Sequence, residues 1–503
     1  MVRVATHPDF LRLRRGLAII AVCLALVCSW QALSRGIDYA GVALRYEPPL
    51  DGQEGMAMWE ASLLRDGHRL YQPVVPDRFV SAPYPPVHPL VLALLGPSTG
   101  ENAFLEGRIV SLFAAVGVAV CGFGAVYSTT RSRLGGLLAA VTILSFAPLQ
   151  LWAFRIKPDM LGLCFTVAGL WLVSAWGERS TVTAEGAFAQ GLRRRRHIPL
   201  VLGLAAFAFV LAHFTKQTLL AGPLAAGTYL LLREWRLAIW WGLLCLLLLV
   251  VTWLALDLLT WGQYTYHVWV LHKLPWYGSR FWKLAAQLRD AWPLALLGVA
   301  GLVVSWKRPT ALNAYLLWAP ASLIGAGVVG SHHNHLLETG IALALAGGQA
   351  VGFGLTRGGV LRVAAPVLLA TQLLVWREPL PWFVGDFDPD PTYGRYFNFI
   401  RATPGEIMAD DVGLLYAAGR PLRYDDPAAM GPASVLDLWD DSQFIEDIQV
   451  GRFSAIMIEI DVFAEDGLLD PSGRWTPRML RAIRDAYEIK FRDSVLIYVP
   501  KTP

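Results

Sequence analysis

Residues 237–259 read LAIWWGLLCLLLLVVTWLALDLL, a run of 23 residues with one charged side chain, Asp257. A helix needs about 20 consecutive, mainly apolar residues to cross the hydrocarbon core of a bilayer. The run therefore predicts a membrane-spanning helix. Similar runs recur from Leu17 to Trp376, so we expect a polytopic all-α membrane domain.

The composition of the chain agrees with this class. Of the 503 residues, 55% are hydrophobic and only 16% are charged, whereas a soluble domain has about 25% charged residues. A single soluble enzyme is thereby excluded. So is a disordered chain, because 20 Trp, 22 Phe and 16 Tyr could not stay solvated. About eleven spans are predicted, at residues 16–33, 108–128, 134–152, 159–176, 198–215, 217–232, 237–259, 291–306, 311–330, 335–355 and 360–376.

Charge divides the chain near residue 377. From Arg377 onward there are 22 acidic and 13 basic residues, a net charge of −9. Because the whole chain carries a net charge of +4, residues 1–376 carry +13. We expect a membrane domain at 1–376, with a long first loop at 34–107, and a water-soluble domain at 377–503. Short apolar runs alternate with helical patterns in the latter, which predicts a small α/β domain. The expected strands are 406–410, 455–460 and 495–499, and the expected helices are 413–420 and 477–487.

Basic residues occupy every second predicted loop. Such residues select the cytoplasmic side of a membrane. This predicts a multi-pass protein of the cell membrane with a cytoplasmic N-terminus and an exoplasmic C-terminus. The long first loop and most unusual polar motifs then share the exoplasmic face. The basic clusters are Arg12 to Arg15, Arg131 and Arg133, Arg193 to Arg196, Arg233 and Arg236, Lys307 and Arg308, and Arg357 and Arg362.

Two carboxylates in the first loop stand three residues apart, Asp51 and Glu54. On a helix they face the same way. One interpretation is a capping box at the start of a short helix over 56–66. The other is a carboxylate that acts as a general base at the edge of the bilayer.

Cations in short exoplasmic loops oppose the usual charge bias and need an explanation. Arg155, Lys157 and Asp159 lie at one helix pair, and Lys216 lies at another. The basic side chains could extend to lipid headgroups. Alternatively they could hold a phosphate between the helices.

Histidines and an acid mark the start of a later span, in Ser331-His332-His333-Asn334-His335-Leu336-Leu337-Glu338. Their spacing does not match a tight metal site. Contacts to a polar ligand are the preferred interpretation, because a carboxylate such as Glu338 inside a span needs a partner.

Several motifs in this order resemble the GT-C superfamily of membrane glycosyltransferases. The resemblance is to the bacterial branch related to protein O-mannosyltransferases and aminoarabinose lipid A transferases, and it covers nearly the whole chain. It rests on Gln53-Glu54, Gly67-His68-Arg69-Leu70-Tyr71, Tyr84-Pro85-Pro86, Gly107-Arg108, Arg155 to Asp159, Lys216-Gln217-Thr218, Asn334 to Glu338, Thr403-Pro404-Gly405 and Asp410-Asp411-Val412-Gly413.

The resemblance implies inverting transfer of a sugar from a polyprenyl-phosphate donor to an acceptor on the exoplasmic face. The family often has Asp-Glu where this chain has Gln53-Glu54. Glu54 is therefore the first candidate for the base and Asp51 the second, with Asp159 as an auxiliary acid. Arg155, Lys157 and Lys216 are the expected phosphate ligands. The expected substrate contacts are Tyr71, Tyr84, His332, His333, Asn334 and Glu338.

The nature of the partners stays partly open at this stage. The acceptor can be a lipid, a glycan or a protein, and no nucleic-acid partner is expected. No metal ligand is assigned. Some members of the family use a divalent metal ion and others do not. The alternative is a lipid-linked glycan transporter, or another polytopic binding protein without chemistry. The crowding of polar groups on one face and the long first loop favour the enzyme.

Overall fold

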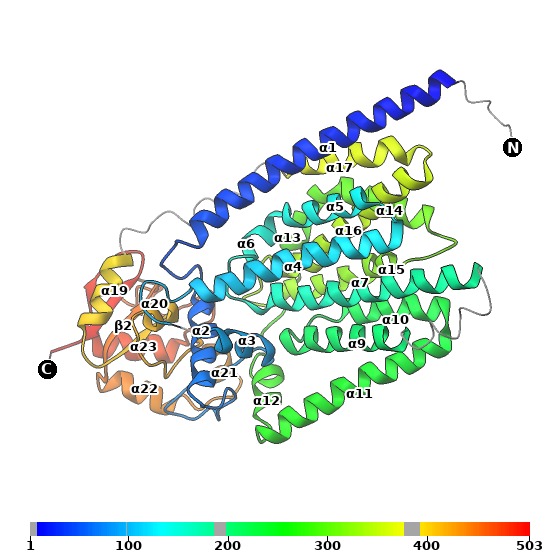
Figure 1. Cartoon of the computed structure of the whole chain (residues 1–503). Coiled ribbons are helices and arrows are strands. Elements are labelled where there is room, and N and C mark those ends of the chain that lie inside the picture. The colour runs from blue at the N-terminus through cyan, green and yellow to red at the C-terminus, as the bar shows by residue number, and fades with distance from the viewer. Residues whose placement is uncertain (1–7, 97, 186–197, 377–392, 503) are drawn as a thin grey trace.

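The computed structural model describes residues 8–96, 98–185, 198–376 and 393–502. A bundle of helices forms most of the molecule, and a smaller α/β part sits at one end of it (Figure 1). The bundle helices are α1 (Pro8–Ala43), α4 (Leu105–Thr130), α5 (Arg133–Leu144), α6 (Ala147–Trp152), α7 (Pro158–Glu185), α9 (Ile198–Thr215), α10 (Ala221–Arg233), α11 (Trp235–Leu259), α14 (Trp292–Val304), α15 (Ala311–Trp318), α16 (Asn334–Arg357) and α17 (Leu361–Val375). Shorter helical segments connect them, namely α12 (Gln263–Thr265), η1 (Tyr266–Val270), α13 (Gly278–Ala285), η2 (Ala286–Ala291) and η3 (Ala319–Gly327).

Each predicted span is mainly helical in the described residues, although two are interrupted. The span at 134–152 divides into α5 and α6, and the span at 311–330 divides into α15 and the 3₁₀ segment η3. Within the part of the chain that the structure describes, six helices are long and apolar enough to cross a membrane. The count of eleven crossings therefore remains a prediction. The basic cluster at Arg193 to Arg196 and the expected boundary at residue 377 lie outside the described residues.

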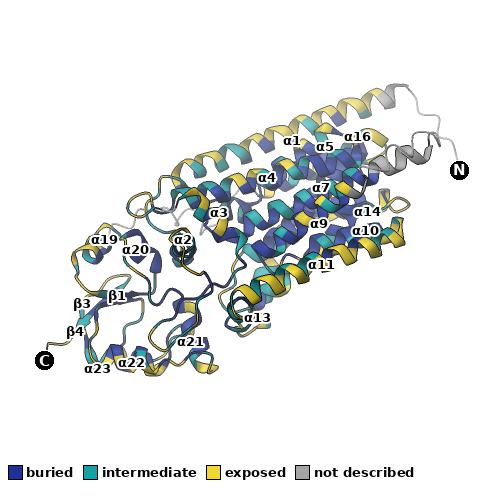
Figure 2. Ribbon diagram, turned by 60° about the horizontal axis from the view of Figure 1, so that its bottom comes forward, coloured by how far each residue is buried: buried dark blue, intermediate teal, exposed yellow. Residues whose placement is uncertain are grey.

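Burial separates inner helices from outer ones. Helix α16 is almost entirely buried, whereas α11 buries only Trp241 and Cys245 of its 25 residues. Figure 2 shows exposed residues along α1 and α11 on the outer sides of the bundle. Small residues let α16 approach its neighbours closely. A Cβ atom added at Gly348 would lie 2.4 Å from that of Ala139. An apolar exterior of this kind is expected for a multi-pass membrane protein.

A four-stranded mixed sheet forms the centre of the α/β part. The strands are β1 (Glu406–Ala409), β2 (Phe453–Ile458), β3 (Tyr487–Phe491) and β4 (Leu496–Pro500), in the order β1-β2-β4-β3. Strand β1 pairs parallel to β2, and the other pairs are antiparallel, with Ile456 opposite Tyr498. The expected strands correspond to β1, β2 and β4. The helices of this part are α19 (Tyr393–Ala402), α20 (Val412–Ala417), α21 (Pro427–Val435), α22 (Ser442–Gln449) and α23 (Pro477–Ala486).

The first loop joins the bundle to the α/β part and contains α2 (Gly52–Arg65) and α3 (Val87–Leu95). Beyond α2, the amide of Phe79 donates to the carbonyl of Arg423 at 2.9 Å, and that of Asp425 donates to the carbonyl of Phe79 at 3.1 Å. The Phe79 ring packs on Trp439, whose indole N–H donates to the carbonyl of Val75 at 3.0 Å. The loop and the α/β part therefore share one core, next to the end of the bundle.

Candidate active site

Asp51 is the N-cap of α2 and lies among cations. Its Oδ1 accepts a hydrogen bond from the amide of Gln53 at 3.0 Å. Its Oδ2 lies 3.0 Å from Nη1 of Arg155 and 2.9 Å from Nζ of Lys157. Burial alone would raise the pKa of Asp51, but Lys157 and Arg155 outweigh burial and lower it to about 2. Asp51 is therefore ionised at every physiological pH.

Glu54 is sealed inside the protein. Its Oε2 accepts from the amide of Leu50 at 2.9 Å and from Nη2 of Arg108 at 2.8 Å, and its Oε1 accepts from the amide of Ile156 at 3.1 Å. Arg108 also donates to the carbonyls of Ala43, Tyr46 and Pro48. Both charged side chains are 1% exposed or less. Glu54 therefore ties the first loop to α4 through Arg108. Its assignment as the first candidate for the base stays a prediction, which this enclosed placement does not favour.

A cavity of about 260 Å³ lies where the bundle, the first loop and the α/β part meet. We call it the lysine cavity. Lys157 and Lys216 line it from helix ends, and Gln53 and Tyr84 line it from the first loop. Two cations from separate helices thus face one space, as expected for a phosphate site.

Each lysine is held by one carboxylate. Lys157 pairs with Asp51, and Lys216 pairs with Asp159. Asp159 is 2% exposed and lies behind Lys216 rather than on the cavity wall. Arg155 is likewise not among the residues that line this cavity. Its guanidinium lies over the Trp152 ring at 5.2 Å and directs a nitrogen to Asp51. Of the three expected phosphate ligands, the two lysines reach the cavity and Arg155 supports them.

The six expected substrate contacts divide into two groups. Tyr84, His332 and Asn334 line the lysine cavity, whereas Tyr71, His333 and Glu338 do not. The Tyr71 hydroxyl donates to the carbonyl of Tyr84 at 2.9 Å, so Tyr71 fixes the loop from behind. Nε2 of His333 contacts Gln287 at 3.1 Å. Glu338 accepts a long hydrogen bond, 3.4 Å, from Tyr315 deeper in the bundle.

Burial, Lys157 and Arg155 all lower the pKa of His332. A neutral imidazole at the wall can accept a hydrogen bond as well as donate one. Within the described residues, no group of three or more His, Cys, Asp or Glu is arranged to hold a metal ion.

The sequence interpretation missed two polar residues of the lysine cavity, His272 and Asp426. Asp426 Oδ2 accepts from the hydroxyl of Ser81 at 2.9 Å and lies 3.2 Å from Nε2 of His272. The other ring nitrogen of His272 lies 2.9 Å from the carbonyl of His267. Both ring nitrogens of His272 therefore lie next to oxygen atoms. A faint signal existed in Asp-Asp-Pro at 425–427, but that pattern is equally typical of a helix cap, and Asp426 does cap α21.

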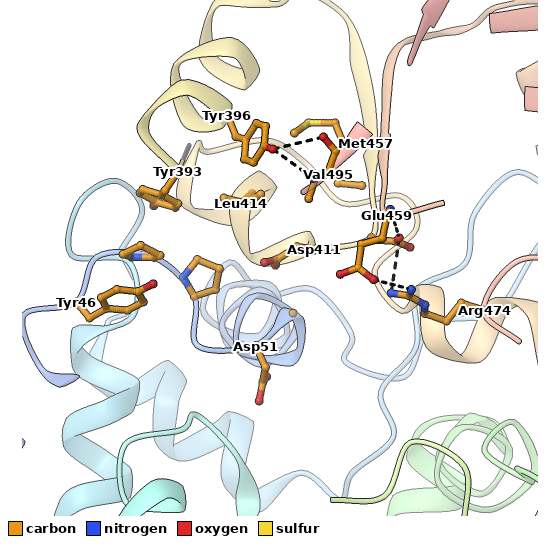
Figure 3. Close-up of a pocket in the computed structure, with 15 residues that line it drawn as sticks. Tyr46, Asp51, Tyr393, Tyr396, Asp411, Leu414, Met457, Glu459, Arg474 and Val495 are labelled. Carbon is orange, nitrogen blue, oxygen red and sulfur yellow. Dashed lines mark hydrogen bonds and ion pairs between the residues drawn. The ribbon is translucent and has the colours of Figure 1, made fainter. Parts of the chain in front are cut away.

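A second cavity, of about 350 Å³, opens on the other side of the start of α2. We call it the Asp51 cavity (Figure 3). Gly52 lines this cavity and Gln53 lines the lysine cavity, so the first residues of α2 separate the two. Asp51 lines the second cavity, but its carboxylate points away from it in Figure 3 and lies at the amide of Gln53 and at Lys157, two residues that line the lysine cavity.

No family model and no curated protein sequence matches the chain. Solved structures do match it. The crystal structure of ArnT from Cupriavidus metallidurans in the apo state superposes with a TM-score of 0.58 and 14% identity, covering 96% of this chain and 98% of that chain. ArnT bound to undecaprenyl phosphate gives 0.56 and 15% over the same shares. The archaeal oligosaccharyltransferase AglB from Archaeoglobus fulgidus, in complex with an inhibitory peptide and a dolichol-phosphate, gives 0.53 and 10%, covering 97% of this chain and 74% of that chain.

These likenesses establish the architecture. Identities of 10–15% are too low to carry a function across, but near-complete coverage with TM-scores above 0.5 is a likeness of fold. The resemblance drawn from the sequence motifs is confirmed at that level: the chain has the fold of the GT-C membrane proteins ArnT and AglB.

Proposed function

We propose that the chain is an inverting glycosyltransferase that moves a sugar from a polyprenyl-phosphate donor to an acceptor on the exoplasmic face of the membrane. One observation carries the proposal. Lys157 and Lys216 face one cavity at the end of an apolar bundle, directly beside an ionised carboxylate, Asp51. The proteins that share the fold were solved with undecaprenyl phosphate and with dolichol-phosphate, which supports a donor of this class.

The two lysines suit a departing phosphate. An ammonium group has three N–H donors, and each lysine uses one of them on Asp51 or Asp159. The remaining donors are available to phosphate oxygens. As the bond from the anomeric carbon to the phosphate oxygen breaks, its electron pair stays on the phosphate. Positive charges already in place stabilise that charge without reorganisation. Asp159 then acts as a positioning residue for Lys216.

Asp51, rather than Glu54, is the base in this proposal. The acceptor hydroxyl attacks the anomeric carbon on the face opposite the phosphate, a new C–O bond forms, and the hydroxyl proton passes to the Asp51 carboxylate. A carboxylate with a pKa of about 2 is a weak base. We therefore infer that the proton moves late, once the anomeric carbon has developed positive charge and has made the attacking hydroxyl acidic.

The same geometry supports separate roles for the two domains. We propose that residues 1–376 hold the donor and that residues 377–503 form an exoplasmic domain that completes both cavities. Asp426 on the lysine cavity and Glu459 on the Asp51 cavity both come from the latter segment.

The test is consumption of a panel of labelled polyprenyl-phosphate sugars by the protein in lipid nanodiscs, with a membrane extract as the source of acceptor. We expect at least one donor to be consumed, and Asp51→Asn to slow transfer by about 10²–10⁴-fold. Lys216→Ala should weaken donor binding, whereas the exposed Lys307→Ala should leave it unchanged. Donors that bind but are never consumed would favour the lipid-linked glycan transporter and would contradict the proposal.

A further inference from the structure

A cavity of about 200 Å³ lies at the end of the bundle away from the α/β part. We call it the arginine cavity. Asn334 at the start of α16 lines the lysine cavity, and Arg357 at the end of the same helix lines the arginine cavity. Over the 24 residues of α16, at about 1.5 Å per residue, the two ends are about 35 Å apart. This distance is close to the thickness of the hydrocarbon core of a bilayer, about 30 Å. The arginine cavity is therefore separate from the candidate active site and lies at the headgroups of the other leaflet.

Three arginines from different parts of the chain line the arginine cavity. They are Arg233 at the end of α10, Arg308 in the turn before α15, and Arg357. Among the described residues that line this cavity, none is acidic. The planar guanidinium group binds phosphate through pairs of parallel N–H···O bonds. The composition of the wall therefore favours an anion with several oxygen atoms.

Neighbouring groups hold two of these guanidinium groups in place. Nη1 of Arg233 donates to the carbonyl of Gly177 at 2.9 Å, and the same guanidinium lies over the Tyr229 ring, 5.1 Å from its centre. The guanidinium of Arg357 lies over the Phe353 ring, 4.0 Å from its centre. A guanidinium has five N–H groups, so contacts of this kind are compatible with binding of a phosphate. Because the side chains are already ordered, less conformational entropy is lost when an anion binds.

A buried hydroxyl group is a second feature of the wall. Ser174 of α7 lines the arginine cavity and is 6% exposed. Its Oγ makes no hydrogen bond within the part of the chain that the structure describes. By contrast, Oγ of Ser145 at the end of α5 donates to the carbonyl of Val141 at 2.7 Å. Unsatisfied buried groups are uncommon in folded proteins, and a bound group with oxygen acceptors would account for this one.

The size of the cavity and its surroundings restrict the ligand further. A volume of about 200 Å³ is below the range of about 300–1,000 Å³ for pockets that take drug-sized molecules. A single phosphate group therefore fits better than a nucleotide. Leu232, next to Arg233, is 64% exposed, and Trp306, close to Arg308, is 82% exposed. Tryptophan at such a position is typical of the interface between membrane and water, so acyl chains can lie beside the cavity.

We propose that the arginine cavity binds a phosphate group at the membrane surface remote from the candidate active site, through the guanidinium groups of Arg233, Arg308 and Arg357. A phospholipid headgroup and free inorganic phosphate both carry this group. The exposed apolar side chains beside the cavity favour the phospholipid. This inference is independent of the proposed function and of its sidedness.

The experiment measures binding to the full chain in micelles of an uncharged detergent, by calorimetric titration and by the thermal midpoint. The probes are dioctanoyl phosphatidic acid, inorganic phosphate, dioctanoylglycerol and octanoate. We expect saturable binding of phosphatidic acid and a thermal midpoint that rises with its concentration. Weaker binding of inorganic phosphate would assign the site to a lipid headgroup, and equally tight binding would assign it to free phosphate. Either result supports a phosphate site.

Matched variants locate the binding. The double variant Arg308→Gln with Arg357→Gln should raise the Kd of phosphatidic acid by about tenfold or more. The control, Arg236→Gln with Lys307→Gln, removes two positive charges at the same end of the bundle from residues that do not line the cavity, and it should leave the Kd nearly unchanged. All four side chains are exposed, so both variants should fold, and the thermal midpoint without ligand checks this.

Four results would overturn the proposal. They are no binding of either phosphate probe, equally tight binding of dioctanoylglycerol or octanoate, equal losses in the two double variants, and loss of the binding in Lys216→Ala. The last result would place the ligand in the lysine cavity and would support the proposed function instead. Failure of the wild type to consume any donor would defeat the proposed function and leave the arginine cavity unaffected.

Discussion

Two carboxylates three residues apart have opposite environments at the start of α2. Asp51 is 21% exposed and pairs with two cations at a cavity wall, whereas Glu54 is fully buried and its oxygens are used by Arg108 and two backbone amides. Spacing alone could not separate them. The capping box was partly correct: Asp51 accepts from the amide of Gln53, and Glu54 accepts from Leu50 rather than from its capping partner.

The pairing of Glu54 with Arg108 predicts a large effect on stability. Glu54→Ala leaves a buried guanidinium without its counter-charge, which we expect to cost about 3–5 kcal/mol. The thermal midpoint of the protein in nanodiscs measures the loss. Arg289→Ala is a matched control, because the pair of Arg289 and Asp290 is mostly exposed and is worth less than about 1 kcal/mol. Equal midpoints for the two variants would contradict the tie between the first loop and α4.

Asp411 predicts a pH dependence of stability with a definite sign. The ordinary pKa of its carboxyl is 3.8, and the fold raises it to about 7. Between these values the folded state binds more protons than the unfolded state, so stability falls as pH rises and levels off above pH 7. Asp411→Asn should remove this part of the slope while it keeps the cap on the amide of Gly413. Thermal midpoints across this pH range measure the slope, which should be unchanged in Asp485→Asn, on the exposed side of α23. A variant slope equal to that of wild type would contradict the prediction.

Residues of the candidate site could be predicted from the sequence where they belong to one of the motifs named above. The structure brings five of the residues named from the motifs to one cavity, namely Lys157, Lys216, Tyr84, His332 and Asn334, and their roles stay predictions. His272 and Asp426 were missed because they meet only through the tertiary fold, 154 positions apart in the chain. The Asp51 cavity was missed for the same reason, since it exists only where the first loop meets the α/β part.

At the scale of elements, the helices that could be predicted best are those that contain a long run of apolar residues. The predicted spans near α4, α7, α11 and α16 match these helices to within a few residues at most boundaries. In the α/β part, β1, β2, β4, α20 and α23 were found, but α19, α21, α22 and β3 were not. Helix α21 contains Pro432, and β3 is a mostly exposed edge strand with the sequence YEIKF, so neither has a strong periodic signal.

The close contact between α2 and α20 predicts that a single added methyl group, in Gly55→Ala, destabilises the protein. A Cβ atom at Gly55 would lie 2.3 Å from Cα of Gly413 and 2.5 Å from its nitrogen. Backbone atoms cannot move aside as a side chain can, so Gly55→Ala must separate the two helices. We expect a loss of about 1–3 kcal/mol and faster proteolysis of the α/β part, measured by thermal unfolding and limited trypsin digestion. At Gly203 in α9 nothing lies within 4 Å of the added atom, so Gly203→Ala should be neutral or stabilising by up to about 1 kcal/mol. Equal behaviour of the two variants would argue against close packing of α2 on α20.

At the scale of the whole molecule, a group of arginines and the two candidate cavities lie at opposite ends of the bundle. Arg233, Arg308 and Arg357 come from three separate turns and line one small cavity. The lysine cavity and the Asp51 cavity lie at the other end, beside the α/β part. This arrangement matches the pattern of basic loops in the sequence, and positive loops remain in the cytoplasm. The proposed sidedness therefore depends on one physical bias acting along the whole chain.

That bias predicts which end can be labelled from outside the cell. In a variant without the five native cysteines, Ser472→Cys in the α/β part should react with a membrane-impermeant maleimide on intact spheroplasts. Lys307→Cys, at the arginine end, should react only after the membrane is permeabilised. Both positions are exposed in the fold, so a difference between them reports the membrane and not burial. The reverse pattern would place the two cavities in the cytoplasm, where the proposed transfer would draw on donors and acceptors of that side. Exoplasmic transfer requires the first pattern, because the lysines, Asp51 and the α/β part share one end of the bundle and must face the same compartment.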